Sequence, residues 1–215
     1  MAVFHHLYSK ISRGTHTCAV ATAAYRSGSR MTLRAKNYGK DTYEEYVFDF
    51  SRKPGIGYSA IIAPKEIEGK VYDRQVLWQN VEDADISFDA DLAREFTLSL
   101  PEELSTDQNI DLIKEFVSTS FIKRGFIADV NYHNDHLNNH HLHILCPLRQ
   151  IKIANGSTLL FLSPHPLFSC QETLKKIQQE QVELINKHLS LNGYSERISI
   201  TADKIPRYSK MRPWL

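Results

Sequence analysis

The chain has 215 residues and a formal net charge of +1, with 42% hydrophobic and 24% charged residues, as is ordinary for a soluble globular protein. No run approaches the roughly 20 apolar residues of a membrane span. The N-terminus lacks the charged start and apolar middle of a signal peptide. The three cysteines are scattered and form no Cys-x-x-Cys pair, so neither a disulfide framework nor a thiolate metal site is expected. A cytoplasmic location is therefore predicted.

The basic side chains are unevenly distributed along the chain. Residues 1–40 contain seven Lys or Arg and no Asp or Glu, which leaves 19 basic and 25 acidic side chains for the rest. A basic N-terminal part on an acidic body indicates that a polyanion binds at one surface. A solvated basic helix without a partner is the alternative interpretation.

The apolar pattern predicts a series of strands and helices along the chain. A first strand is expected over residues 2–8, followed by an Ala-rich helix from Thr17 to about Ser29, with Gly28 as its stop signal. Residues 42–50 and 57–63 are expected to form a hairpin. The later elements are a helix over 73–84, a strand over 94–100, a helix that follows the capping box Ser105–Gln108 and stops at Gly125, strands over 126–133 and 140–148, and a helix over 171–191.

This order of elements is typical of an α+β fold. Strand pairs joined by tight loops predict a central antiparallel sheet, with the helices packed mainly on one face. Residues 1–200 are expected to form one domain, and residues 201–215 a short basic tail.

The segment 133–143 contains five of the ten histidines. His141 and His143 are two residues apart, so on a strand both rings leave from one face. His133 ends the preceding predicted strand, and a short polar loop could bring it beside the pair. Three imidazoles that converge from adjacent strands would form a metal site with an open position, which is the catalytic kind. A His-rich surface loop is the alternative.

Two further residues extend this hypothesis. Glu95 lies on the polar face of the 94–100 strand, where its carboxylate could accept the free ring N–H of a metal-bound histidine. Imidazole ligands leave zinc, nickel, cobalt and manganese open, and both hydrolysis and phosphoryl transfer are compatible with such a site. The basic charge of the helix that carries Tyr25 favours a phosphate substrate, and tyrosine can form a covalent intermediate. A single tyrosine is more often a core or interface residue.

Several stretches of the sequence resemble the MobA/MobL-type plasmid relaxases of the HUH endonuclease superfamily. The paired signature is a tyrosine after an Ala-rich helix together with an upstream His and a His-x-His pair, and the resemblance covers residues 1–197. The matching stretches are Ile11–Arg13, Ala19–Gly28, Asp49–Lys53, Ile61–Pro64, Asp73–Trp78, Leu92–Glu95, Leu100–Leu104, Gly125–His133 and Asn139–His143.

The resemblance implies an HUH relaxase-like fold and a metal-dependent, sequence- and strand-specific endonuclease and transesterase for single-stranded DNA. Tyr25 would attack the scissile phosphate at a plasmid origin of transfer, and a 5′-phosphotyrosine and a free 3′-OH would initiate conjugative mobilisation. His133, His141 and His143 would hold one divalent ion, Mn²⁺ or Mg²⁺ in the first place and Zn²⁺, Ni²⁺ or Co²⁺ otherwise. Glu95 would orient a histidine or assist proton transfer.

The expected partners are single-stranded and hairpin DNA of the origin of transfer, with relaxosome accessory proteins and a coupling protein as further candidates. Arg13, Arg26 and Arg30 are expected to bind the DNA backbone, on the basis of their charge and position.

The sequence departs from the family pattern at three places. His140 stands where the family usually has Pro, and on a strand it points away from the pair, so it is treated as a non-ligand. Ala60 stands where the family often has an acidic residue. The match fades after Arg197, where many relaxases continue into long C-terminal regions, so a minimal relaxase and part of a longer one are both open.

Three other functions are compatible with parts of this pattern. A replication initiator or transposase of the same superfamily would share the chemistry, although the matches outside the active site argue against it. A metal-stabilised single-stranded DNA-binding module would lack catalysis. A zinc hydrolase of small substrates would leave the basic N-terminal part unexplained.

Overall fold

The computed structural model describes most of the chain, namely residues 6–13, 18–37, 42–67, 69, 73–85, 87, 89–134, 140–154 and 158–199. His136 and the expected basic tail at 201–215 lie outside these residues. Within the described ranges, none of the helices has both the length and the apolar character that crossing a membrane requires.

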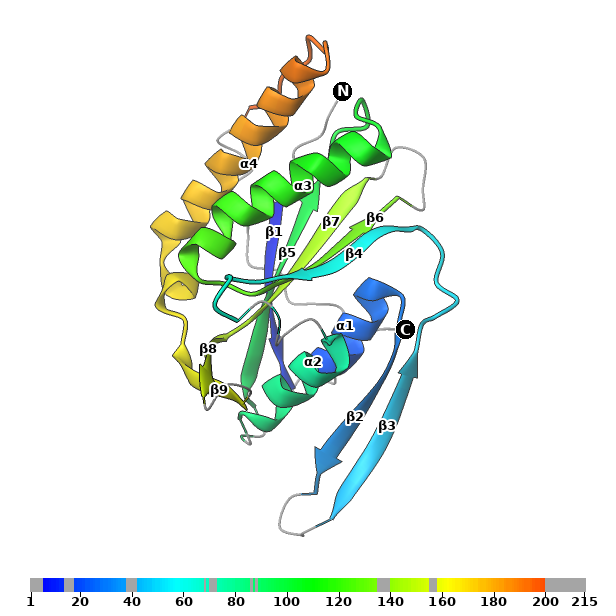
Figure 1. Cartoon of the computed structure of the whole chain (residues 1–215), viewed down its shortest axis with the longest axis vertical. Helices are drawn as coiled ribbons and strands as arrows, with labels where there is room; N and C mark the ends of the chain where they lie inside the picture. The colour runs from blue at the N-terminus through cyan, green and yellow to red at the C-terminus, as the bar shows by residue number, and fades with distance from the viewer. Residues whose placement is uncertain are drawn as a thin grey trace.

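A five-stranded antiparallel sheet forms the centre of the molecule (Figure 1). The α+β class and the central antiparallel sheet predicted from the sequence are therefore confirmed. From one edge to the other, the strands are β1 (His6–Ser12), β5 (Asp91–Ser99), β7 (His141–Pro147), β6 (Ala128–His133) and β4 (Ile56–Ile62).

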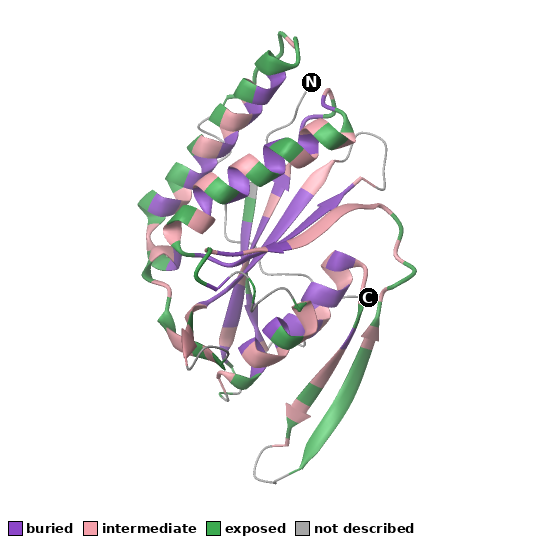
Figure 2. Cartoon of the chain, in the orientation of Figure 1, coloured by how far each residue is buried: buried purple, intermediate pink, exposed green. Residues whose placement is uncertain are grey.

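Helices pack on both faces of this sheet, whereas the sequence led us to expect them mainly on one. α3 (Thr106–Ser120) and α4 (Gln171–Leu191) share a core with one set of alternating strand residues, such as Phe96 and Ile144. α1 (Ala19–Ser27) and α2 (Arg74–Asp83) share a second core with the opposite set, such as Ala93 and Leu145. The physical reason is that the inner strands are buried on both sides, as Figure 2 shows for β6 and β7.

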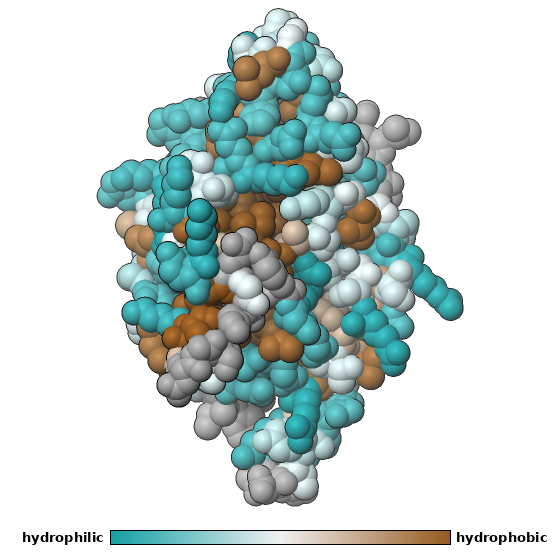
Figure 3. Space-filling view, viewed as in Figure 1, coloured by the Kyte–Doolittle hydropathy of each residue, from teal (hydrophilic) through white to brown (hydrophobic). Residues whose placement is uncertain are grey.

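Local sequence signals set several helix ends as expected. Ser105 and Gln108 form the predicted capping box at the start of α3. α4 covers the predicted range, and the outer sides of α3 and α4 carry mostly hydrophilic side chains (Figure 3). α1 ends at Gly28, whose φ of 61° is left-handed. A Cβ at Gly28 would lie 2.9 Å from the Ile56 side chain, so glycine also permits close contact with the start of β4.

The predicted hairpin of residues 42–50 and 57–63 is wrong in its pairing. β3 (Tyr43–Asp49) pairs with β2 (Arg30–Lys36), a strand that the sequence pattern did not reveal, while β4 pairs with β6. The chain does turn between β3 and β4, but there it passes from a two-stranded ribbon into the central sheet (Figure 1). β4 gains burial in the central sheet, where its residues are half-buried and Ile61 packs in the second core. Most residues of β3 are exposed, so β3 has no comparable apolar face for the sheet.

The ribbon of β2 and β3 is attached to α2 by two glutamine side chains. Gln75 donates to the carbonyl of Thr32 and accepts from its N–H, both at 2.7 Å. Gln79 forms the same pair of bonds with Arg34, at 2.9 and 3.0 Å. Each amide side chain therefore acts like one residue of a neighbouring strand, which holds the ribbon beside the helix.

A second two-stranded sheet follows the central one. β8 (Arg149–Ala154) and β9 (Thr158–Pro164) form an antiparallel hairpin that the sequence analysis did not predict. Its partly buried apolar side chains, such as Ile151 and Phe161, pack against the second core. Two short 3₁₀ helices, η3 (Ile122–Arg124) and η4 (Pro166–Ser169), complete the described elements.

Candidate active site

Three histidines converge on the face of the sheet that α1 and α2 partly cover. His133 of β6 lies directly opposite His141 of β7, and His143 follows two residues later on the same face. The centroids of the three rings lie 4.8 to 5.1 Å apart. One ligand nitrogen from each ring lies within 4.8 Å of the others, so the group could hold a metal ion. Three imidazoles form a donor set suited to a divalent cation.

Hydrogen bonds orient two of these imidazoles. His143 Nδ1 lies 2.9 Å from Glu95 Oε1 and 3.1 Å from the Thr97 hydroxyl, so a proton on Nδ1 leaves Nε2 as the ligand atom. His133 Nε2 lies 2.6 Å from the carbonyl oxygen of Arg26, so a proton on Nε2 leaves Nδ1 as the ligand atom. Partners of this kind fix the tautomer and the direction of a metal-binding imidazole.

Burial keeps these two histidines neutral. It lowers the pKa of His133 to about 3, and the Lys53 ammonium acts in the same direction, as would His143 and His141 when protonated. Burial likewise lowers the pKa of His143 to about 4, with Arg26 adding to the effect. At neutral pH both rings are therefore in the form that binds a metal ion.

Glu95 connects the histidines to helix α1. Its carboxylate is buried and accepts a hydrogen bond from Arg26 Nε at 2.7 Å as well as the bond from His143. Burial alone would raise the pKa of Glu95, but Arg26 and His143 outweigh that effect and hold it at about 2. The carboxylate is therefore ionised and able to orient His143.

Tyr25 lies beside this group, at the C-terminal end of α1. It directly precedes Arg26, whose carbonyl bonds to His133 and whose guanidinium pairs with Glu95. The Tyr25 ring meets the edge of Phe50, with centroids 5.2 Å apart and planes at 90°. Lys53 Nζ lies 3.8 Å from the centroid of the same ring. The structure thus brings Tyr25, Glu95 and the three histidines into one region.

Lys53 was not among the residues chosen from the sequence. The sequence feature that could have pointed to Lys53 was its place at the end of the matching stretch Asp49–Lys53. A lysine in a turn, however, usually just faces solvent. Only the fold shows that this turn lies against the end of α1.

A buried polar network beside the histidines was also not predicted from the sequence. Asp129 accepts hydrogen bonds from Arg74 Nε and Trp78 Nε1, each at 2.8 Å, and from Asn131 Nδ2 at 3.0 Å. Asn131 lies opposite His143 in the strand register. The network joins α2 to the histidine-bearing strands, which gives a structural reason for the matching stretch Asp73–Trp78.

The three arginines expected to bind DNA have different surroundings. The guanidinium of Arg13 bonds to the Glu82 carboxylate and to the main-chain carbonyls of Glu82, Asp85 and Ser87, so it holds the loop after α2 in place. Arg26 pairs with Glu95 and is largely buried. Arg30 is exposed, and its contact with Asp49 is 3.9 Å long.

His140 lies outside the histidine group, as expected. Its Nδ1 lies 2.7 Å from the hydroxyl of Tyr132, a residue of the core beneath α3 and α4. It therefore faces the opposite side of the sheet from His141 and His143.

Comparison with known proteins decides the family. The family model of the MobA/MobL family matches residues 17–160. The chain belongs to the MobA/MobL family. This result confirms the resemblance found in the sequence.

Individual members and relatives agree with this assignment. The conjugal transfer protein TraA of Rhizobium radiobacter is 34% identical over 224 residues, covering 92% of this chain and 20% of its own length. The mobilization protein MobL of Acidithiobacillus ferridurans is 34% identical over 133 residues, covering 62% of this chain and 32% of its own length. This MobA/MobL chain thus spans about a fifth of the TraA protein it matches.

Two solved structures share the fold. One, described as "Molecular Basis of Vancomycin Resistance Transfer in Staphylococcus aureus", matches with a TM-score of 0.77 and 29% identity, over 94% of this chain and 100% of that one. The conjugative relaxase TrwC in complex with oriT DNA, in a copper-bound form, matches with a TM-score of 0.51 and 11% identity, over 90% and 73%. The second likeness extends to the fold alone.

Proposed function

We propose that the protein is a DNA relaxase that nicks one strand at a plasmid origin of transfer and becomes linked to the 5′ end through Tyr25. The observation that carries this proposal is the connection between the tyrosine helix and the histidines. Arg26, the residue after Tyr25, bonds to His133 through its carbonyl and to Glu95 through its guanidinium. The proposed nucleophile Tyr25 and the three-histidine group are therefore linked through the neighbouring residue Arg26.

In this reaction the phenol oxygen of Tyr25 forms a bond to phosphorus while the bond from phosphorus to the 3′ oxygen of the preceding nucleotide breaks. The phenol proton passes to solvent, and the released 3′ oxygen takes a proton from water. The product is a 5′-phosphotyrosine with a free 3′-OH. Because one phosphoester replaces another, a 3′-OH can later attack the linkage and rejoin the strand, which would allow conjugative mobilisation.

The residues of the site would act before and during this exchange. A divalent ion bound by His133, His141 and His143, of which Mn²⁺ and Mg²⁺ are the first candidates, would polarise the scissile phosphate and offset its developing charge. Glu95 holds the His143 ring in the ligating tautomer. The buried ion pair with Arg26 keeps that carboxylate in place.

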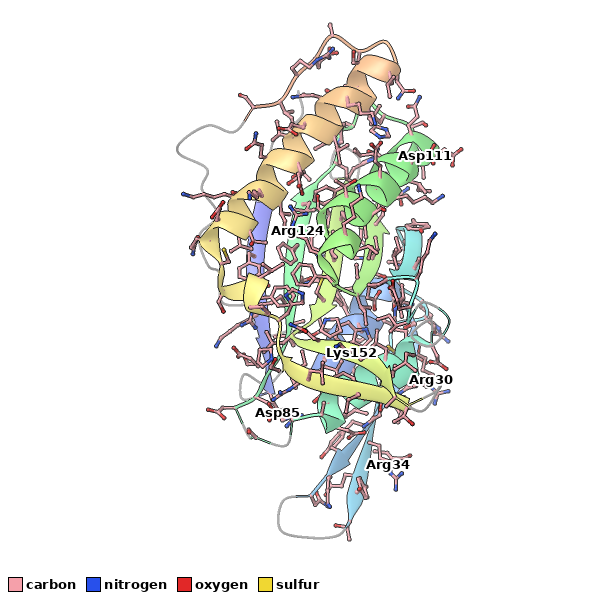
Figure 4. The ribbon with its side chains drawn as sticks, turned by 60° about the vertical axis from the view of Figure 1, so that its left-hand side comes forward. Arg30, Arg34, Asp85, Asp111, Arg124 and Lys152 are labelled. Atoms are coloured by element: carbon pink, nitrogen blue, oxygen red, sulfur yellow. The ribbon has the colours of Figure 1, made fainter. Side chains whose placement is uncertain are left out.

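DNA would be bound partly by exposed cations near the ribbon of β2 and β3. Arg30 and Arg34 lie on β2, with Arg30 at the end of the ribbon nearer to the sheet (Figure 4). We assign phosphate binding to Arg30 and a positioning role to Arg26, because the first is exposed and the second is committed to Glu95. Arg13 is assigned to structure rather than to DNA. Accessory proteins and a coupling protein are proposed as further partners.

The decisive experiment is the detection of the covalent adduct. The protein is incubated with Mn²⁺ or Mg²⁺ and labelled single-stranded oligonucleotides that tile a candidate origin, then separated on a denaturing gel. We expect a band of protein-linked DNA with the wild type and none with Tyr25→Phe, although both proteins bind the oligonucleotide. Chelation of the metal should abolish the band as well.

Two outcomes would contradict this function. Adduct formation by Tyr25→Phe would exclude Tyr25 as the nucleophile. Tight binding by the wild type without any adduct, on oligonucleotides from the origin of its own replicon, would favour a DNA-binding module without catalysis.

A further inference from the structure

Lys53, in the turn between β3 and β4, contacts Tyr25 in two ways. Its Nζ donates a hydrogen bond to the main-chain carbonyl of Tyr25 at 3.0 Å. The same atom lies 3.8 Å from the centroid of the Tyr25 ring. One contact holds the main chain and the other the side chain, so together they restrict both the position and the direction of the phenol.

The end of helix α1 explains why a cation lies there. The last carbonyl groups of a helix lack N–H partners within it and lie at the negative end of its dipole. In α1, the carbonyl of Tyr25 accepts from Lys53, and the next one, of Arg26, accepts from His133 Nε2 at 2.6 Å. Consecutive carbonyls thus tie the helix to the turn and to the histidine-bearing strand.

The turn that carries Lys53 is itself held against α1. Lys53 N–H donates to the Phe50 carbonyl at 2.9 Å, and Phe50 N–H donates to the Ser29 carbonyl at 3.1 Å. The Phe50 ring also meets the Tyr25 ring edge-on, with centroids 5.2 Å apart. The Tyr25 ring therefore has the Lys53 ammonium over it and Phe50 against it, both from one short segment.

We propose that Lys53 is a positioning residue for Tyr25, holding the phenol for attack on the scissile phosphate and keeping a positive charge beside it. This inference rests on the proposed function, because it concerns the nucleophile of that reaction. Lys53 is half-buried, so its attraction to the aromatic ring is less weakened by water than at an exposed site. A positive charge next to the nucleophile also favours the approach of a phosphodiester.

Four variants test this role in single-turnover cleavage at saturating DNA. Lys53→Met removes the charge at nearly constant length, Lys53→Gln retains a hydrogen-bond donor, and Lys53→Arg retains the charge. Arg52→Met is the matched control, because Arg52 is an exposed cation in the same turn. We expect Lys53→Met and Lys53→Gln to lower the cleavage rate about 10- to 100-fold with less than about threefold change in DNA affinity. Lys53→Arg should stay within about fivefold of the wild type.

A second readout does not depend on activity. The protein is labelled with 3-fluorotyrosine, and the ¹⁹F resonance of Tyr25 is assigned by its loss in Tyr25→Phe. Lys53→Met should move this resonance toward the value of unfolded tyrosine, whereas Arg52→Met should leave it in place. Thermal unfolding midpoints of all variants confirm that the comparison is made on folded protein.

The outcomes separate this inference from the proposed function. A wild-type adduct together with a normal cleavage rate for Lys53→Met would overturn the role of Lys53 alone. The role would also be wrong if Arg52→Met lowered the rate as much as Lys53→Met, because the effect would then be one of general charge. Failure of the wild type to form any adduct would overturn the proposed function itself.

Discussion

The two faces of the central sheet carry out different tasks with the same strands. On β5, Phe96 and Leu98 face the core beneath α3 and α4, while Glu95 and Thr97 face the histidines. Phe96, Leu98 and Glu95 are buried and Thr97 is half-buried, but the first set is apolar and the second consists of paired polar groups. The comparison shows that burial has two uses here, namely packing on one face and control of protonation and orientation on the other.

The largest effect on stability is expected from the apolar face. Phe96 is fully buried and its ring meets those of Tyr8 and Phe121, with centroids 5.1 and 5.0 Å away. Phe96→Ala should lower the free energy of unfolding by about 3–5 kcal/mol, measured by denaturant titration. The neighbouring change Thr97→Ala, on the other face, should cost only about 1 kcal/mol. Equal losses for the two variants would contradict this division of the faces.

A substitution among the histidines of the polar face should lower the affinity for a metal ion rather than the free energy of unfolding. His141→Ala removes a proposed ligand that is half-buried, so we expect Mn²⁺ affinity, measured by titration calorimetry, to fall by more than about 100-fold, while the unfolding free energy changes by less than about 1 kcal/mol. His140→Ala is the control, since its ring bonds to Tyr132 on the other side. A normal Mn²⁺ affinity in His141→Ala would exclude His141 as a ligand.

A smaller loss of metal affinity is expected for a residue that orients a metal-binding histidine than for the histidine itself. Glu95→Gln retains the shape of the side chain but removes the charge that pairs with Arg26 and orients His143. Metal affinity should fall by about 10- to 100-fold, which is less than for His141→Ala. The same titration calorimetry on folded protein measures both. The reverse order of the two losses would show that the roles of ligand and supporting carboxylate are assigned wrongly.

The candidate site was predictable from the sequence to the extent that it depends on strand alternation. A period of two places His141 and His143 on one face, and the same rule places His133 and Glu95 there once the strands are neighbours. The structure has these strands in that arrangement, with β7 between β5 and β6. The surroundings of Arg13 were not predictable in this way, because charge and position in the chain do not reveal that Glu82 and three carbonyls surround its guanidinium.

Strand pairing was less predictable than strand position. The strands predicted over residues 42–50 and 57–63 correspond to β3 and β4, but their partners are β2 and β6 rather than each other. A turn with Pro and Gly favours a hairpin locally, yet the pairing follows the burial that each strand can gain elsewhere. The hairpin of β8 and β9 was missed as well.

By itself, the sequence determined the α+β class, the Gly28 and Ser105 helix caps, the alternation that groups the histidines, and the family. These depend on short-range rules of backbone conformation and side-chain period. Only the tertiary structure decided that helices cover both faces, that Arg26 links Glu95 to His133, and that Lys53 bonds to the Tyr25 carbonyl. Those contacts join residues far apart in the chain, and burial and charge pairing select them only when the whole fold is assembled.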